Sequence, residues 1–433
     1  MTEPAARPNE RDDGAAGTLG HVRWTVCAML FLATTINYID RQVIALLKPT
    51  LQQTIGLTEI NYGYIVDAFQ IAYAAGLLLT GRLVDRLGTR IGYMLVMAVW
   101  SFSAMGHALA STALQFGVAR FFLGLGESGN FPAAIKTVAE WFPQKERSLA
   151  TGLFNSGANL GAIIGPIIVA WAVLHYGWHA AFLVTGVFSA AWIVVWFLNY
   201  RTPEKHPHLQ AAERRYIHKD GAPTTAPGAA WKTLLRYRQT WGFSCAKFLT
   251  DPIWWFYLFW LPSYLSAKFA MTLGQMRVPL VIVYTVSTIG SVGGGWLPAP
   301  FRKLGFSPAQ ARLAAMLVCA SLVLPVFFLN GVRSLGVAIA ILSMAAGAHQ
   351  GWSANLFTTA SDMFPRSSVG AVVGIGGMAG SVGGALFAFF AGHILQITHS
   401  YAILFAIAAS AYLIALAALY LIAQGLRRAE LAG

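Results

Sequence analysis

Apolar residues are concentrated in twelve runs of about twenty residues, and short polar gaps separate these runs. At a rise of about 1.5 Å per residue, a helix of that length crosses the roughly 30 Å hydrocarbon core of a bilayer. The runs lie near 24–47, 60–80, 91–110, 113–134, 148–172, 178–200, 241–266, 278–298, 309–329, 334–357, 367–392 and 400–424. The pattern predicts an all-α membrane protein with twelve transmembrane helices.

The composition supports this prediction and excludes several other classes of protein. Only 11% of the residues are charged and 56% are apolar, whereas about a quarter of an average soluble domain is charged. The net charge of +13 comes from bases in the polar gaps, so it does not indicate a nucleic-acid-binding surface. Cys27, Cys245 and Cys319 lie inside apolar runs without a metal-binding spacing. We expect the protein to bind no metal, no cofactor and no nucleic acid. We expect it to be a monomer whose helices are surrounded by membrane lipid.

The distribution of lysine and arginine predicts the orientation of the chain. With both termini in the cytoplasm, 23 bases fall in cytoplasmic segments and 4 in periplasmic gaps. The first apolar run is too long for the core of a signal peptide, so we expect it to remain as the first helix. The predicted units are a cytoplasmic tail (1–23), an N-terminal six-helix bundle (24–200), a central cytoplasmic loop (201–240), a C-terminal six-helix bundle (241–424) and a second tail (425–433).

The two predicted bundles carry related sequence patterns. A glycine-bounded segment with arginine at 81–88 follows the second run, and a similar segment at 295–305 follows the eighth. An acidic residue, a Phe and a Pro precede both the fifth and the eleventh run, at 140–143 and 362–365, and a glycine stands 19 residues after each Phe. Related halves are typical of transporters whose binding site lies between them.

Four ionisable residues fall inside the first and fourth predicted helices: Asp40, Arg41, Arg120 and Glu127. Each costs about 2.5–3.5 kcal/mol or more to place at membrane depth, so such residues are usually functional. Asp40 and Arg41 lie about 24 Å along their helix, and Arg120 lies about 10 Å from the periplasmic end of the other, which places them in one layer. Glu127 follows Arg120 by two turns on the same face.

Two interpretations of these four charges are open. They can neutralise one another and hold the two helices together. Alternatively, Asp40 and Glu127 carry coupling protons, and Arg41 or Arg120 binds a substrate carboxylate through two parallel hydrogen bonds. In the empty protein the two acids would hold the two arginines, and protonation would release them. Three glycines around Glu127 favour the second interpretation, because we expect them to leave room beside its carboxyl group.

Several segments resemble a known family. The loop Gly81-x-x-x-Asp85-Arg86-x-Gly88-x-Arg90 resembles the loop signature of the major facilitator superfamily, and the layout of two six-helix halves covers nearly the whole chain. Asn37-Tyr38-Ile39-Asp40-Arg41 and the segment 120–127 resemble the anion:cation symporter family. The segments 251–262 and 349–355 resemble bacterial hexuronate transporters, which import glucuronate and galacturonate with protons. Asp67 departs from the pattern, in which a neutral residue is expected, and its role is open.

The resemblance implies the major facilitator fold and proton-coupled import of hexuronates, which are sugar-acid anions, by alternating access across the bacterial inner membrane. It implies coupling roles for the two acids and substrate roles for the arginines. It also implies that Gly81, Asp85, Arg86, Gly88 and Arg90 form a cytoplasmic gate that joins the second helix to the eleventh when the protein faces outward. Ordinary topology signals explain the bases of this loop but leave its glycines and its acid unexplained.

A sugar also needs neutral hydrogen-bonding groups and flat faces. The chain offers Tyr38, Tyr73, Trp255, Gln350 and Asn355, and beside them Gln70, Trp254, Tyr257, His349 and Trp352. The aromatic residues can instead contact lipid at the interface, and Gln350 and Asn355 can instead join two helices by hydrogen bonds. Lys247 and Asp251 stand four residues apart on the seventh helix, a spacing that favours an ion pair.

Energetics favour a proton as the coupling ion. An anion that enters against an inside-negative potential of about 100 mV loses about 2.3 kcal/mol per charge, and one accompanying proton cancels that cost. Two other transport functions stay open: proton symport of another sugar acid such as galactonate, and efflux by an antiporter, which the glycine pattern at 157–166 suggests. The sequence has no HExxH motif and no phosphate-binding P-loop, so we expect no enzyme.

Overall fold

The computed structural model describes residues 20–219 and 231–429. The described residues form α-helices and two short 3₁₀ helices and contain no strand, which confirms the predicted all-α fold. Residues 220–230 of the predicted central loop, and residues 1–19 and 430–433 of the predicted tails, lie outside the described residues.

The N-terminal half crosses the membrane six times. Its helices are α1 (Val22–Ile55), α2 (Glu59–Gly106), η1 (His107–Leu109), α3 (Ala113–Glu127), α4 (Asn130–Trp141), α5 (Gln144–Tyr176) and α6 (Trp178–Asn199). The long α2 contains two crossings, because Gly88 breaks the helix with φ of 76° and ψ of 159°. Glycine adopts this positive φ without a Cβ penalty. The helices α3 and α4 together make one crossing.

The C-terminal half repeats this plan. Its helices are α9 (Arg238–Phe269), α10 (Leu273–Trp296), α11 (Pro298–Lys303), α12 (Pro308–Val323), η2 (Leu324–Gly331), α13 (Leu335–Met363), α14 (Arg366–Thr398) and α15 (Ala402–Ile422). The segments α12 and η2 follow one another and form one crossing, and α11 is a short extension after α10. Between the halves lie α7 (Ala211–Ile217) and α8 (Trp231–Leu234).

Nine helical segments within the described ranges are long and apolar enough to span a membrane. The other three crossings are the first part of α2, the α3–α4 pair and α9, which bring the described total to the predicted twelve. Several ends differ from the prediction. The first helix continues to Ile55 instead of stopping near residue 47, because buried Lys48 is paired with Glu59 at 2.6 Å and does not end the helix in solvent.

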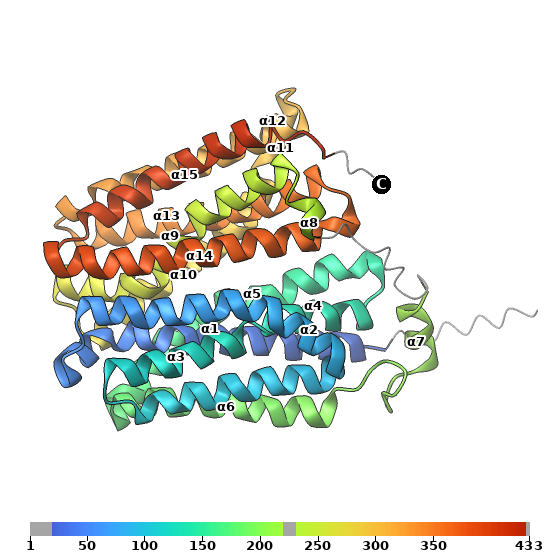
Figure 1. Cartoon of the computed structure of the whole chain (residues 1–433), viewed down its shortest axis with the longest axis horizontal. Coiled ribbons are helices and arrows are strands. Elements are labelled where there is room, and N and C mark those ends of the chain that lie inside the picture. The colour runs from blue at the N-terminus through green and yellow to red at the C-terminus, as the bar shows by residue number, and fades with distance from the viewer. Residues whose placement is uncertain (1–19, 220–230, 430–433) are drawn as a thin grey trace, which may run out of the picture.

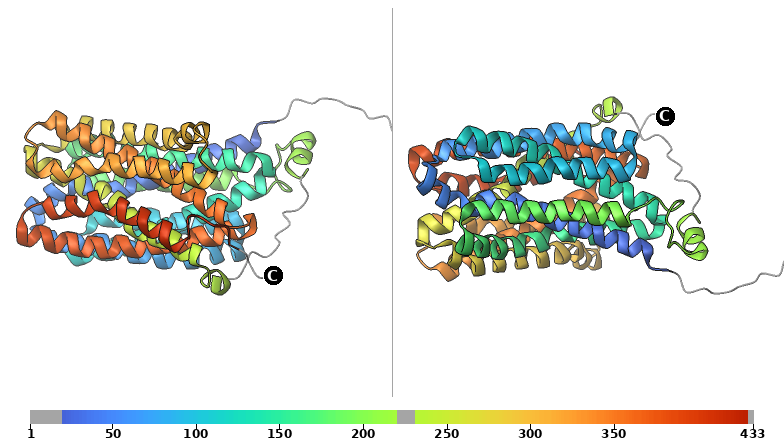
Figure 2. Two further views of the ribbon diagram at one scale, coloured as in Figure 1. Left: turned by 90° about the horizontal axis from the view of Figure 1, so that it is seen from above. Right: turned by 90° about the horizontal axis from the view of Figure 1, so that it is seen from below.

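The two halves pack side by side, with α2 against α14, α5 against α10 and α1 against α9. Figures 1 and 2 show the two layers of helices, with α7, α8 and the C-terminal end of the described chain at one end of the molecule. We refer to this end as the termini end and to the other as the opposite end. Because α1 begins at the termini end and the crossings alternate, the starts of α5 and α14 also lie there.

The halves touch at the opposite end and are apart at the termini end. Near the opposite end, a Cβ on Gly63 of α2 would stand 2.9 Å from Ala388 O and 3.2 Å from Gly392 Cα of α14. Near the termini end, glycines on four helices that flank the interface have no described atom of a neighbouring helix within 4 Å of the Cβ position: Gly81, Gly152, Gly293 and Gly370. Among the described residues, the interface between the halves is therefore closely packed at the opposite end and has open positions at the termini end.

A polar network closes the opposite end. Lys48 Nζ donates to Glu59 Oε2 at 2.6 Å, and Gln52 Nε2 donates to Glu59 Oε1 at 2.8 Å. The backbone N of Glu59 donates to Gln396 Oε1 of α14 at 3.1 Å. One turn further on, the Tyr62 hydroxyl donates to Phe259 O of α9 at 2.7 Å. These bonds join α1 and α2 to two helices of the other half.

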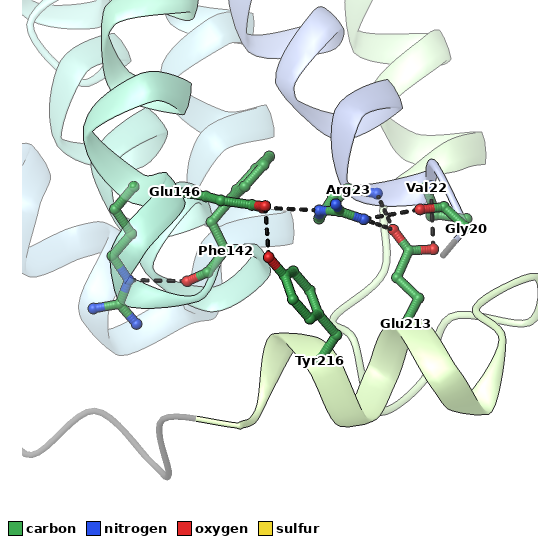
Figure 3. A network of polar contacts seen from close by, with 8 residues as sticks. Gly20, Val22, Arg23, Phe142, Glu146, Glu213 and Tyr216 are labelled. Atoms are coloured by element: carbon green, nitrogen blue, oxygen red, sulfur yellow. Dashed lines mark hydrogen bonds and ion pairs between the residues drawn. The ribbon is translucent and has the colours of Figure 1, made fainter. Parts of the chain in front are cut away.

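A second network, at the termini end, holds the central segment on the N-terminal half (Figure 3). Glu213 of α7 accepts hydrogen bonds from the backbone N of Val22 and Arg23, at 3.3 and 3.2 Å, and from Arg23 Nη1 at 3.0 Å. Arg23 Nε also donates to Glu146 Oε2 of α5 at 3.1 Å, and Tyr216 Oη donates to Glu146 Oε1 at 2.7 Å. Glu213 therefore satisfies the free N–H groups at the start of α1.

Candidate functional site

The centre of the candidate site is an ion pair between α1 and α3. Arg41 Nη2 and Nε lie 2.7 and 2.8 Å from the same oxygen of Glu127, Oε2. Arg41 Nη2 also donates to Asn37 Oδ1, one turn earlier on α1, at 3.1 Å. The other carboxylate oxygen, Glu127 Oε1, is buried and has no hydrogen-bond partner among the described residues. Both residues are 98% or more buried, with 2% and 1% of their surface exposed.

Four aromatic rings surround the Arg41 guanidinium. Its Cζ atom lies 4.9 to 5.1 Å from the ring centroids of Tyr38, Phe69, Tyr73 and Trp255. Ring faces at this distance attract a cation. Tyr38 comes from α1, Phe69 and Tyr73 come from α2, and Trp255 comes from α9 of the C-terminal half. Arg41 therefore lies where the two halves meet. We call these four rings the aromatic box.

Asp40 points away from this pair, into the N-terminal half. Its Oδ2 atom accepts hydrogen bonds from Trp100 Nε1 of α2 and Ser189 Oγ of α6, both at 2.6 Å. Its Oδ1 atom is buried without a partner among the described residues. Adjacent residues on a helix face different directions, which separates the Asp40 carboxylate from the Arg41 guanidinium.

Arg120 lies beside Arg41 but has no acidic partner among the ion pairs of the described residues. Its Nη2 atom donates to the backbone oxygen of Arg41 at 2.5 Å, and its Nε and Nη1 atoms are buried without a partner. The guanidinium lies 5.1 Å from the Phe69 ring and 5.6 Å from the Phe259 ring. The expectation that two acids hold two arginines thus differs from the structure, in which Glu127 holds Arg41 and neutral groups hold Asp40.

The two predicted amides occupy different surroundings. Gln350 is half-buried on α13, with no hydrogen bond recorded to another described residue. Asn355 is 1% exposed, and its Nδ2 atom donates to Gly294 O of α10 at 2.7 Å and to Gly351 O at 2.9 Å. Asn355 therefore makes the helix–helix hydrogen bond that was the alternative interpretation of this residue.

The comparison with known proteins decides the family. The sequence profile of the Major Facilitator Superfamily matches residues 30–388. The chain belongs to the major facilitator superfamily. It is similar to the hexuronate transporter of Escherichia coli K12, with 32% identity over 90% of this chain and 91% of that protein. It is also similar to the galacturonate transporter of Dickeya chrysanthemi, with 32% identity over 65% of this chain and 83% of that protein.

A solved structure agrees on the fold. A bacterial homologue of the human lysosomal transporter Spinster, in an inward-facing and occupied conformation, aligns with a TM-score of 0.75 and 17% identity, over 95% of this chain and 99% of that chain. At this identity the likeness concerns the fold. The chain is therefore a multi-pass membrane transporter built from two six-helix bundles, and it is not an enzyme.

The predicted gate of this facilitator lies at the termini end, where the halves are apart. Gly88 makes the break between the two crossings of α2. Arg90 Nη2 donates to Phe197 O of α6 at 2.8 Å, and Arg86 is exposed. Gly81 has open space beside it. The side chain of Asp85 lies outside the described part of the structure.

The glycines near Glu127 correct one expectation. A Cβ on Gly124 would overlap Phe69 O, and a Cβ on Gly126 or Gly129 would stand 2.6 Å from Trp100 N or 2.7 Å from Val96 Cγ1. These glycines bring α3 and α4 against α2 and do not leave space beside the Glu127 carboxyl group. The glycine pattern of α5 has a similar structural cause, because Cβ atoms on Gly157 and Gly161 would overlap backbone oxygens of α1.

Sequence reasoning missed Phe69, which contacts both arginines, because an apolar residue in an apolar helix carries no signal. Asp67, whose role the sequence leaves open, is half-buried on α2, and its Oδ1 atom has no described partner. Tyr64, one turn before it, contacts Phe389 and His393 of α14 with ring centroids 6.0 and 5.8 Å away. Within residues 20–219 and 231–429, no group of three or more His, Cys, Asp or Glu side chains is placed to hold a metal ion.

Proposed function

We propose that this transporter imports hexuronates, which are sugar-acid anions, together with protons. The observation that carries the proposal is the Arg41–Glu127 pair inside the aromatic box, at the junction of the two halves. A buried guanidinium among ring faces suits a ligand with a carboxylate at one end and a sugar ring beside it. The similarity to transporters named for hexuronate and galacturonate supports the same substrate class.

Arg41 receives the substrate carboxylate in this proposal. A guanidinium can bind a carboxylate through two parallel hydrogen bonds, whereas Arg41 Nε and Nη2 both approach a single oxygen of Glu127. Tyr38, Tyr73 and Trp255 are only partly buried, so part of each ring is available to the sugar beside Arg41. Arg120 donates to the backbone of Arg41 and helps to fix its position.

Glu127 couples transport to protons. A proton on the free Oε1 atom neutralises the carboxylate and weakens its hold on Arg41, which then accepts the substrate. One proton and one anion cross together, so the membrane potential does not oppose entry of the anion. Asp40 is a second candidate proton site, because its Oδ1 atom is also buried without a described partner.

Alternating access follows from the two ends of the interface. With both termini in the cytoplasm, as the count of 23 to 4 bases predicts, the open end faces the cytoplasm. The structure would then represent an inward-facing state of an inner-membrane protein. The Lys48–Glu59–Gln396 network would close the periplasmic side, and the segment 81–90 would close the cytoplasmic side in the other state.

The proposal is tested in liposomes that contain the purified protein and an internal pH dye. External galacturonate and glucuronate should each drive acidification of the interior, and galactonate should drive little. Equal acidification with galactonate would show that the protein does not select hexuronates over other sugar acids. No acidification with any of the three, in intact vesicles, would contradict hexuronate–proton symport and favour efflux or an unrelated anion.

A further inference from the structure

A second pair of opposite charges lies at membrane depth in the C-terminal half. Lys247 Nζ and Asp251 Oδ2 are 2.7 Å apart on α9, and their side chains are 8% and 20% exposed. The helix α14 makes room for the pair, because a Cβ on Gly380 would overlap the Asp251 carboxylate. The transport mechanism proposed above assigns no role to either residue.

A purely structural role explains the pair poorly. Both residues belong to one helix, one turn apart, so their ion pair joins no two elements. A pair at this spacing stabilises a helix by less than the cost of placing two charges at membrane depth. Ionisable residues within transmembrane segments are usually retained for contact with a substrate or an ion.

The internal repeat places Asp251 next to the substrate site. A Cβ on Gly161 of α5 would overlap Thr35 O of α1, and a Cβ on Gly383 of α14 would overlap Phe248 O of α9 in the same way. The two glycines are the repeat partners that stand 19 residues after each Phe-Pro sequence. If Thr35 corresponds to Phe248, then Asp251 occupies in its half the place that Tyr38 occupies beside Arg41.

Trp255 connects this pair to Arg41. It follows Asp251 by one turn, about 6 Å along the same face of α9, and its ring lies 4.9 Å from Arg41 Cζ. Beside the ring, Gln70 is completely buried, and both its amide atoms lack a described partner. A Cβ on Gly384 would stand 2.9 Å from Gln70 Nε2 and 3.1 Å from Trp255 Cδ1. A buried amide without partners points to a ligand that completes its hydrogen bonds.

We propose that Asp251, held by Lys247, binds the end of the substrate that is remote from its carboxylate and requires that end to be uncharged. This inference rests on the proposed function. With the carboxylate on Arg41 and the sugar along Trp255, the remote hydroxyl groups donate to Asp251. A sugar diacid, such as galactarate, brings a second carboxylate to the same place and is repelled, because Lys247 is already neutralised by Asp251.

The test is competition for galacturonate counterflow in liposomes without a pH gradient, with unlabelled galactarate as the competitor. The wild-type protein should be inhibited by galacturonate and about a hundredfold less by galactarate. In the Asp251→Asn variant, Lys247 is free to bind the second carboxylate. Galactarate should therefore inhibit this variant at least about tenfold more strongly than it inhibits the wild-type protein. Asp362→Asn is the matched control. It breaks another ion pair of the same half, Arg312–Asp362, whose atoms are 2.6 Å apart and whose side chains are more exposed than those of Lys247 and Asp251.

Each outcome decides the matter. Wild-type protein that galactarate inhibits as well as galacturonate does would overturn the proposal without any variant. A folded Asp251→Asn protein that still excludes galactarate would overturn it too. If Asp251→Asn does not fold, the double variant Lys247→Met with Asp251→Asn replaces it, because this variant keeps the net charge of the pair. The double variant should bind galacturonate about tenfold more weakly than the wild-type protein. Unchanged binding would contradict a contact between Asp251 and the substrate. Wild-type protein without counterflow of any sugar acid would instead count against the proposed function.

Discussion

Arg41 Nε donates a hydrogen bond to Glu127 Oε2 at 2.8 Å, Arg41 Nη2 lies 2.7 Å from the same oxygen, and the second oxygen of that carboxylate has no described partner. The pair is buried, so its guanidinium is not free for a substrate while Glu127 is charged. Removal of one partner from a buried ion pair costs about 3–5 kcal/mol. A proton on Glu127 and an anion on Arg41 are therefore expected to arrive together, which is the physical basis of symport.

Glu127→Gln should abolish proton-driven accumulation of galacturonate and preserve galacturonate counterflow. The amide cannot take up or release a proton, but it keeps the shape of the carboxyl group and competes for Arg41 more weakly than a charged carboxylate does. Uptake under a pH gradient and counterflow without a gradient measure the two properties separately. Glu204→Gln, at an exposed surface position, is the control and should change neither. Full accumulation by the Glu127 variant would remove the coupling role assigned to this residue.

Arg41→Lys should weaken galacturonate binding about a hundredfold, because an ammonium group cannot make two parallel hydrogen bonds to a carboxylate. Arg120→Lys serves as the comparison. Arg120 already donates to the backbone of Arg41, so we expect a smaller loss of affinity, about tenfold. Counterflow at several galacturonate concentrations gives both values. A larger loss in the Arg120 variant would show that Arg120, and not Arg41, holds the carboxylate.

Glu213→Ala should lower the thermal stability of the protein without changing which substrate it transports. The change removes the acceptor for two backbone N–H groups of α1 and for Arg23, which is also bound to Glu146. Each hydrogen bond to a charged group contributes about 1.5–3 kcal/mol to the free energy of unfolding. The melting temperature of the purified protein measures the effect, and Glu204→Ala is a matched exposed control. An unchanged melting temperature would mean that α7 does not stabilise the N-terminal half.

The sequence was sufficient for the number and order of the crossings, because an apolar run of bilayer length has few other uses. It also placed Asp40, Arg41 and Arg120 in one layer, with Glu127 two turns from Arg120 on the same helix face; the structure pairs Arg41 with Glu127. It did not identify the partners of Asp40, since depth follows from residue count but the contacts of a side chain depend on neighbouring helices. Trp100 and Ser189 supply the contacts that turn Asp40 away, and nothing in a single helix predicts them.

Residues from the other half were harder to predict. Trp255 was predicted as a flat face for a sugar, but its contact with Arg41 depends on how the two bundles meet. Asn355 shows the converse, because its position in the middle of a helix fitted a cavity and a helix contact equally well. The close approach of α10, with Gly294 O 2.7 Å from its amide, makes the helix contact. The glycines near Glu127 were misinterpreted for the same reason, since space beside a glycine exists only where no neighbouring helix fills it.

Glu59→Gln should shift the transporter toward the state that is open at the opposite end. Lys48 is completely buried and loses its charged partner, while the Glu59 backbone bond to Gln396 remains. An uncompensated buried charge destabilises the closed arrangement by up to about 3–5 kcal/mol. The population of the open state should therefore rise strongly, and exchange between states during counterflow should slow because return to the closed state is less favourable.

Spin labels on exposed Gln53 of α1 and Ile397 of α14, in a cysteine-free background, report the separation of the halves at that end. The Glu59 variant should show a larger share of long distances than the unsubstituted protein. Gln52→Ala is the matched comparison, because it removes a neutral hydrogen bond to the same carboxylate, 2.8 Å long, and leaves the Lys48 pair intact. A smaller shift is expected there. Identical distance distributions in all three proteins would show that contacts such as Gly63 against Gly392, and not the Lys48–Glu59 pair, keep this end closed.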